Sequence, residues 1–242
     1  MSIADDLAKE IRHEIDALKE GEFGEVLFDQ QIFSVLPIEE YLHPEPDVVD
    51  GGETSLEKGN LLGCYVPMKS PGKIFLSRRN IKDFFWSLVL TVRNDIQYIT
   101  KFDLLSGFQL VTLKTYNHEL FHFNCDVLRA CFGGSYDALP EEALAVAWAR
   151  MKIMQERNIW QSQIARMNAA FFRLIMCHAF NYTSPGYRDW HLFADEMLFK
   201  NELIRYIQPT NYDKLLNSGV DVGDMIYRLL GNIKNGFVEK II

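Results

Sequence analysis

Hydrophobic positions near the N-terminus recur every three or four residues, which is the spacing of one apolar helix face. These positions are Ile3, Leu7, Ile11, Ile15 and Leu18. Polar and charged residues fill most positions between them, and Gly21 follows as a helix-ending residue. The pattern predicts an amphipathic helix over residues 3–20.

The next patterned segment consists of two short runs rich in β-prone residues. Leu62–Val66 and Lys73–Leu76 flank the strong turn signal Ser70-Pro71-Gly72, and this arrangement predicts an antiparallel hairpin. Residues 44–60, just before it, hold Pro, Gly and acidic residues without periodicity. Such a composition is typical of a surface loop.

The rest of the chain has helical patterning. The predicted helices cover residues 80–99, 107–132, 141–155, 158–181, 188–207 and 211–240. Gly133-Gly134 would end the second of these, and Ser184-Pro185-Gly186 separates two later ones. We therefore expect an α+β protein that is mostly α, with one small antiparallel β-element ahead of the helix at 107–132.

Charge and composition exclude some classes of function. The formal net charge of −8 disfavours a nucleic-acid binder, which needs a basic surface. The N-terminus carries early acidic residues and no apolar run, so a secretory signal is not expected. No apolar stretch reaches the length of a membrane span, and the four cysteines form no CxxC pair. These features predict a soluble cytoplasmic protein with free thiols and without a membrane or nucleic-acid partner.

The candidate functional residues lie in the stretch TYNHELFHFNCD, residues 115–126. His118 and His122 are four residues apart, so on a helix both imidazoles can reach one point, as two zinc ligands must. Glu119 is rotated about 100° around the helix, where it can take a proton from water beside the metal. Two metal-binding histidines with a proton-accepting glutamate beside them are what an HExxH motif provides.

The alternative is that these are polar residues on a core helix that match the motif by chance. The apolar surroundings count against it, because burying two histidines and a glutamate without partners is costly. Leu120, Phe121 and Phe123 are among those apolar neighbours.

A catalytic zinc site takes three protein ligands, and the start of the next predicted helix offers the third. Pro140 is followed by Glu141 and Glu142, and a short loop would bring either carboxylate back against the first helix. Both acids also suit the positive end of a helix dipole, which alone could account for them.

These residues resemble a known family. HELFH, followed after nineteen residues by Glu142, is similar to the gluzincin pattern of thermolysin-type zinc peptidases. The block from Glu142 to Ala149 resembles the ExxAxxFA signature of ImmA/IrrE-type zincins. Both comparisons select Glu142 over Glu141 as the third ligand.

The resemblance covers about residues 61–150. It implies a single zincin-like domain over 1–242, with an N-terminal extension (1–60), a metal-binding core (61–150) and a helical C-terminal part (151–242).

The resemblance carries further implications for the site. In zincins an edge strand, here Lys73–Ser77, pairs with an extended peptide substrate. Thermolysin-type enzymes place a second acid four residues after the glutamate ligand, but Val146 stands there. Asp126, one turn past His122, could replace that acid as the partner of a zinc-bound histidine, or could simply be a solvated acid.

The expected function is zinc-dependent hydrolysis of a peptide or protein substrate. Zn²⁺ would be held by His118, His122 and Glu142, and Glu119 would act as the general base. Zincins also recruit a downstream residue to stabilise the oxyanion. The segment 177–191 offers His178, Tyr182, Tyr187, Arg188 and His191, and of these we select His178 and Tyr182. The alternative is a zincin-like regulatory or interaction protein, for instance in a stress or phage response, with a structural metal or vestigial activity.

Overall fold

The computed structural model describes residues 3–21, 24–26, 62–66, 73–132, 135–207, 227 and 238–241. In this part of the chain the protein is mostly helical, as the sequence predicts. The predicted loop at 44–60 and the turn at 70–72 lie outside the described residues. Within the described residues, no helix combines the length and apolar character needed to cross a bilayer.

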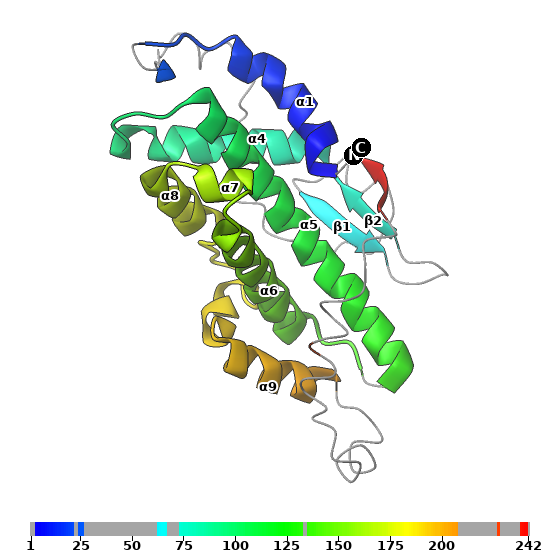
Figure 1. Ribbon diagram of the computed structural model, residues 1–242. Helices are drawn as coiled ribbons and strands as arrows, with labels where there is room; N and C mark the ends of the chain where they lie inside the picture. Colours follow the sequence, from blue (N-terminus) through cyan, green and yellow to red (C-terminus); the bar gives the residue numbers. More distant parts are fainter. Residues whose placement is uncertain are drawn as a thin grey trace.

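The longest element among the described residues is α5 (Lys101–Phe132), a helix of 32 residues that is about 48 Å long. It packs against α6 (Ala138–Asn158), α1 (Ile3–Asp16) and α4 (Arg78–Val92). Figure 1 shows α5 running between α6 on one side and the small sheet on the other. The site residues of α5 are therefore enclosed by neighbours on both sides.

The helix α5 begins earlier than the predicted residue 107 because of a reciprocal cap. The Asp103 backbone N–H donates to Thr100 Oγ1 at 3.1 Å, and the Thr100 backbone N–H donates to Asp103 Oδ2 at 3.0 Å. This is the geometry of a capping box. Gly107 lies inside the helix, where a Cβ atom would be 3.0 Å from Phe171 Cε1 and 3.1 Å from Phe85 Cε2. The glycine allows close packing and does not mark the start of the helix.

A three-stranded sheet lies against α5. Strands β1 (Gly63–Val66) and β2 (Lys73–Leu76) pair antiparallel, which confirms the predicted hairpin strands. Strand β3 (Val238–Ile241) pairs in parallel with β2 on its other side. The prediction that Lys73–Ser77 forms an edge strand is therefore wrong: β2 is central, and β1 lies at the edge of the described sheet. The predicted helix over 211–240 is also wrong at 238–240, while most of that range lies outside the described residues.

Other predicted helices are confirmed with shifted limits. The predicted 80–99 helix is α4, followed by the 3-10 helix η2 (Arg93–Asp95). The range 158–181 divides into α7 (Gln163–Arg166) and α8 (Ala169–Ala179). The range 188–207 divides into the 3-10 helix η3 (Tyr187–Phe193) and α9 (Glu196–Ile207). Asn168 explains the break before α8, because its side chain caps that helix by accepting from Ala170 and Phe171 backbone N–H groups.

Two hydrophobic clusters hold α5 in place. The larger one joins α1, α4, α5 and α8 around side chains such as Trp86 and Phe108. The smaller one joins α5, α6 and α9, where the rings of Trp148 and Phe199 stack with centroids 5.7 Å apart. The start of α6 is thereby fixed against the middle of α5, where the candidate site lies.

Candidate metal centre

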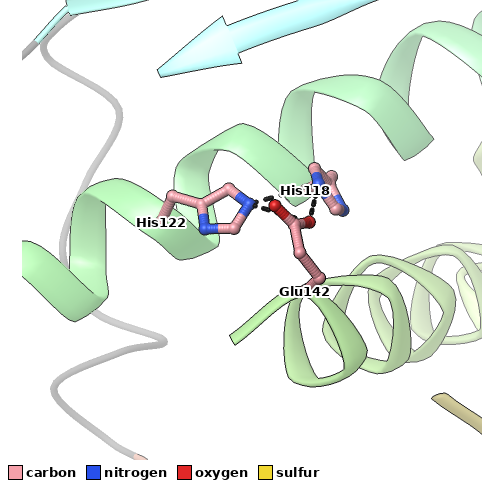
Figure 2. A group of neighbouring side chains, drawn as sticks. All are labelled: His118, His122 and Glu142. Atoms are coloured by element: carbon pink, nitrogen blue, oxygen red, sulfur yellow. Dashed lines mark hydrogen bonds and ion pairs between the residues drawn. The ribbon is translucent and has the colours of Figure 1, made fainter. Parts of the chain in front are cut away.

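The middle of α5 and the first turn of α6 bring three side chains together. His118 and His122 extend from the same face of α5, and Glu142 reaches across from α6 (Figure 2). The side chains of His118 and Glu142 retain 12% and 19% exposure, while His122 is buried. The cluster is thus enclosed but still reachable from solvent.

The three facing atoms have the separations expected of ligands around one small ion. Nε2 of His118 and Nε2 of His122 are 3.2 Å apart. Oε2 of Glu142 lies 3.0 Å from the first of these nitrogens and 3.4 Å from the second. Ligands about 2.0–2.1 Å from a tetrahedral zinc are about 3.3–3.4 Å apart. All three observed separations lie near that value.

The Glu142 carboxylate supports the same interpretation. Its Oε2 atom is buried and has two imidazole nitrogens close to it, but no hydrogen-bond donor among the described residues. A buried carboxylate oxygen without a directed hydrogen bond is costly. A cation at the point that the three atoms share would satisfy it, and two imidazoles with one carboxylate are a donor set that zinc accepts.

The far side of His122 is held by Glu141. The Nδ1–H group of His122 donates to Oε1 of Glu141 at 2.8 Å, which leaves Nε2 directed toward the cluster. The Tyr206 hydroxyl and the Arg129 guanidinium both donate to Oε2 of Glu141. Glu141 is only 1% exposed, so these partners satisfy its buried charge. The two successive glutamates that the sequence leaves open thus have different positions: Glu142 faces both histidines, and Glu141 supports one of them from behind.

Asp126 does not take the supporting role considered for it. Its Oδ1 atom accepts from Arg129 Nη2 at 2.8 Å, and Arg129 in turn contacts Glu141. Val146, which replaces the acid expected from thermolysin-type enzymes, is buried in the core. Glu141 supplies the carboxylate from another position, and adjacency to Glu142 in the sequence was the only signal that could have suggested it.

The electrostatics of the cluster follow from burial and close opposite charges. Burial alone would lower the pKa of His122, but the carboxylates of Glu142 and Glu141 outweigh it and raise that pKa well above its ordinary value of 6.5. Burial alone would raise the pKa of Glu142, but His122 and His118 hold it well below its usual range. Without a metal, His122 and Glu142 therefore attract each other as ions.

Glu119 is buried beside the three clustered side chains, with 7% exposure. Burial raises its pKa, His118 and His122 oppose that rise, and Glu142 adds to it. A carboxylate whose pKa moves upward from the ordinary acidic range toward neutrality is suited to accept and return a proton. The general-base role of Glu119 stays a prediction.

The downstream segment contributes a residue other than the two selected. The Tyr187 ring stacks on His118, with centroids 5.5 Å apart and planes at 23°. Burial and the carboxylates of Glu142 and Glu119 raise the pKa of its phenol well above 10.0. Tyr187 thus keeps its proton and can donate it in a hydrogen bond beside the cluster.

Tyr182 lies one step further away, and His178 is not joined to the cluster. The Tyr182 ring is 5.3 Å from that of Tyr187, and burial raises the pKa of its phenol. Among the described residues, no hydrogen bond, ion pair or ring contact links His178 to the three clustered side chains. Gly186, with φ of +81°, makes the sharp turn that brings Tyr187 into place. It was the available sequence signal for choosing Tyr187.

Lys114, which the sequence analysis did not select, is also close to this site. It lies one helical turn before His118 and is 5% exposed. Burial lowers the pKa of Lys114 to about 7, and Glu119 partly opposes that shift. Cys125 is fully buried and unpaired, and Cys177 is also a free thiol, as expected for these two cysteines.

Comparison of the chain with protein-family models, with curated proteins and with solved structures finds no match.

Proposed function

We propose that the protein is a zinc-dependent peptidase of gluzincin type. The observation that carries this proposal is the convergence of His118, His122 and Glu142 on one point with Glu119 buried beside it. The mostly helical fold with a small sheet against the motif helix is compatible with a zincin-like architecture.

In this proposal His118, His122 and Glu142 hold the metal, and Glu141 orients His122. A bound Zn²⁺ would polarise the substrate carbonyl and lower the pKa of water at the site. Glu119 takes a proton from the attacking water, whose oxygen bonds to the peptide carbon, and returns that proton to the amine as the C–N bond breaks. Tyr187 donates a hydrogen bond to the carbonyl oxygen as it becomes negative.

Tyr187 takes the role for which His178 and Tyr182 were selected from the sequence. It contacts His118 directly, while Tyr182 packs against Tyr187. Tyr182 then acts as a positioning residue that limits the rotation of the Tyr187 ring.

The test is metal analysis together with peptide hydrolysis by the purified protein. We expect one zinc per chain and cleavage of a quenched-fluorescence peptide library. Glu119→Gln should retain zinc but lose hydrolysis by about 10²-fold or more, since it lacks the proton acceptor. Glu142→Ala should lose zinc, and Glu156→Gln, on the same helix but away from the cluster, should behave as wild type.

Two results would contradict the proposal. Absence of stoichiometric zinc would remove its basis, and unchanged hydrolysis in Glu119→Gln would remove the mechanism. Zinc without any hydrolysis would favour the alternative of a regulatory or interaction protein with a structural metal.

A further inference from the structure

Lys114 projects from the face of α5 that carries the candidate metal ligands. Lys114, His118 and His122 follow one another at intervals of four residues, so they lie along one side of the helix. One such interval corresponds to a rise of about 6 Å. The Lys114 side chain is therefore attached to α5 one turn before the cluster of His118, His122 and Glu142.

Three aromatic rings surround the Lys114 ammonium. Nζ lies 4.9 Å from the ring centre of Phe84, 5.1 Å from that of Tyr182 and 5.7 Å from that of Phe180. The rings come from α4, from the end of α8 and from the segment that follows it. Aromatic faces attract a cation, but they do not occupy its N–H donors as carboxylates or carbonyls do.

No hydrogen bond or ion pair to Nζ of Lys114 is found among the residues that the structure describes. Within the described part of the chain, a side chain that is 5% exposed thus carries three donors without a protein acceptor. Such a poorly solvated ammonium is unfavourable, and an incoming anion would relieve the cost.

Aromatic contacts connect this ammonium to the metal cluster. The Tyr182 ring contacts both Lys114 and the Tyr187 ring, and the Tyr187 ring stacks on His118. Glu119 is close enough to affect Lys114 electrostatically. The ammonium and the proposed catalytic groups therefore border the same region.

We propose that Lys114 binds a carboxylate of the substrate, one residue beyond the bond that is cleaved. This inference rests on the proposed peptidase function and adds a substrate class to it. One residue of extended chain covers about 3.3–3.6 Å and a charge-assisted hydrogen bond about 2.8 Å. Because Lys114 and His118 are attached only about 6 Å apart along α5, a carboxylate in the residue next to the cleaved bond is the nearest candidate. The carboxylate is either the free C-terminus of the substrate or an Asp or Glu side chain at that position.

The first experiment compares hydrolysis of three matched peptides by the zinc-loaded protein. One peptide ends in a free carboxylate one residue after the cleaved bond, the second is its C-terminal amide, and the third is an amide with Glu at that position. We expect the wild type to prefer one of the two carboxylate peptides to the plain amide by about 10- to 100-fold in kcat/KM. Whichever carboxylate peptide is preferred identifies the source of the group.

Lys114→Met should abolish that preference, because it keeps the apolar length of the side chain and removes the charge. Lys152→Gln is the matched control. Its ammonium also lies over an aromatic ring, 4.2 Å from the centre of Trp148, but it is away from the cluster. It should keep the wild-type preference.

The second experiment measures binding without turnover. Titration calorimetry of the three uncleaved peptides with zinc-loaded Glu119→Gln, with and without Lys114→Met, should show the same preference and the same loss. This readout does not depend on hydrolysis, so it separates the two proposals. If the protein hydrolyses nothing but the binding preference follows Lys114, only the peptidase proposal fails.

The inference is overturned if the wild type treats amide and carboxylate peptides alike. It is also overturned if Lys114→Met slows all three peptides equally. That result would mean that Lys114 serves only as an electrostatic neighbour of Glu119. A melting temperature for each variant confirms that the compared proteins are folded.

Discussion

His122 is the side chain on which most contacts of the candidate site depend. One of its ring nitrogens faces Glu141 at 2.8 Å, and the other faces His118 and Glu142. Glu141 is itself fixed by Arg129 and Tyr206. Partners of this kind raise the basicity of a metal-ligating histidine and fix its orientation.

We therefore predict that Glu141→Gln weakens zinc binding without removing it. The loss in affinity should be about 10- to 100-fold, as found for outer partners of zinc histidines. Competition with a fluorescent chelator measures it, and Glu156→Gln serves as the control on the same helix. Affinity equal to that of the wild type would show that Glu141 does not support the metal site.

The lowered pKa of Lys114 leads to a separate prediction about stability. Its folded pKa of about 7 lies below the ordinary 10.5, so the unfolded chain binds more protons between these values. Stability must then rise as the pH increases from about 7 to 10.5. Lys114→Met removes this cost and should stabilise the protein by about 2 to 4 kcal/mol at pH 7, with a smaller gain at pH 9.5.

Urea unfolding of wild type and Lys114→Met at the two pH values provides the measurement. If Lys114→Met stabilises the protein equally at both pH values, the Lys114 ammonium does not destabilise the folded protein.

At the scale of elements, the turn before η3 sets the position of Tyr187. Gly186 has φ of +81°, and a Cβ atom there would lie 2.9 Å from the carbonyl oxygen of Leu139 in α6. Both the backbone conformation and the close approach disfavour any side chain at this position.

Gly186→Ala should destabilise the protein by about 1–3 kcal/mol and displace Tyr187 from His118. Gly24→Ala is a suitable control, because Gly24 also has positive φ, +73°, but its Cβ would meet nothing within 4 Å. We expect the second variant to lose less stability and to keep wild-type kcat/KM. Equal effects of the two substitutions on stability and activity would exclude the contact with Leu139 as the cause.

Element prediction from the sequence succeeded where periodicity is strong and failed where long-range contacts decide. The hairpin strands and the helices around the motif were predicted because each carries a local pattern. The start of α5 was placed too late, at Gly107, whereas this glycine lies inside the helix and is needed for contact with Phe85 and Phe171. The central position of β2 depends on pairing with a strand more than 160 residues away, as the register of Ile74 with Val238 shows, and no local signal encodes it.

The same division applies to the candidate site. His118, His122 and Glu142 were selected by their spacing, and the structure brings them together. Tyr187 and the support from Glu141 depend on how η3 and α9 pack against α6. Lys114 was missed because a lysine in a helix is ordinarily solvated, and its enclosure by Phe84, Phe180 and Tyr182 comes from three separate segments.

At the scale of the whole molecule, the candidate ligands join α5 to α6, so metal binding should stabilise the fold. Zinc at about 100 times its dissociation constant adds about 2.7 kcal/mol. For a chain of this length that corresponds to a rise in Tm of about 5–10 °C. Differential scanning calorimetry with zinc and with a chelator measures the difference, and Glu142→Ala should show none.

The rise in Tm on zinc binding should depend on pH. The raised pKa of His122 stabilises the metal-free protein fully below about pH 6.5 and loses its effect as the pH rises through the folded value. The lowered pKa of Glu142 contributes above about pH 4.5 and is lost on acidification below that. Zinc needs the deprotonated imidazole, so the gain in Tm should be larger at pH 8 than at pH 6. An equal or larger gain at pH 6 would contradict this linkage.

The position of His122 between two neighbouring carboxylates also determines where its ring proton resides. Because Nδ1 lies 2.8 Å from the Glu141 carboxylate and Nε2 faces the cluster, a metal bound at Nε2 would leave the ring proton on Nδ1. The choice is made by the docking of α6 on α5, since both glutamates belong to α6. Nitrogen NMR of this single ring would therefore report whether the two helices are assembled, whether or not a substrate is known.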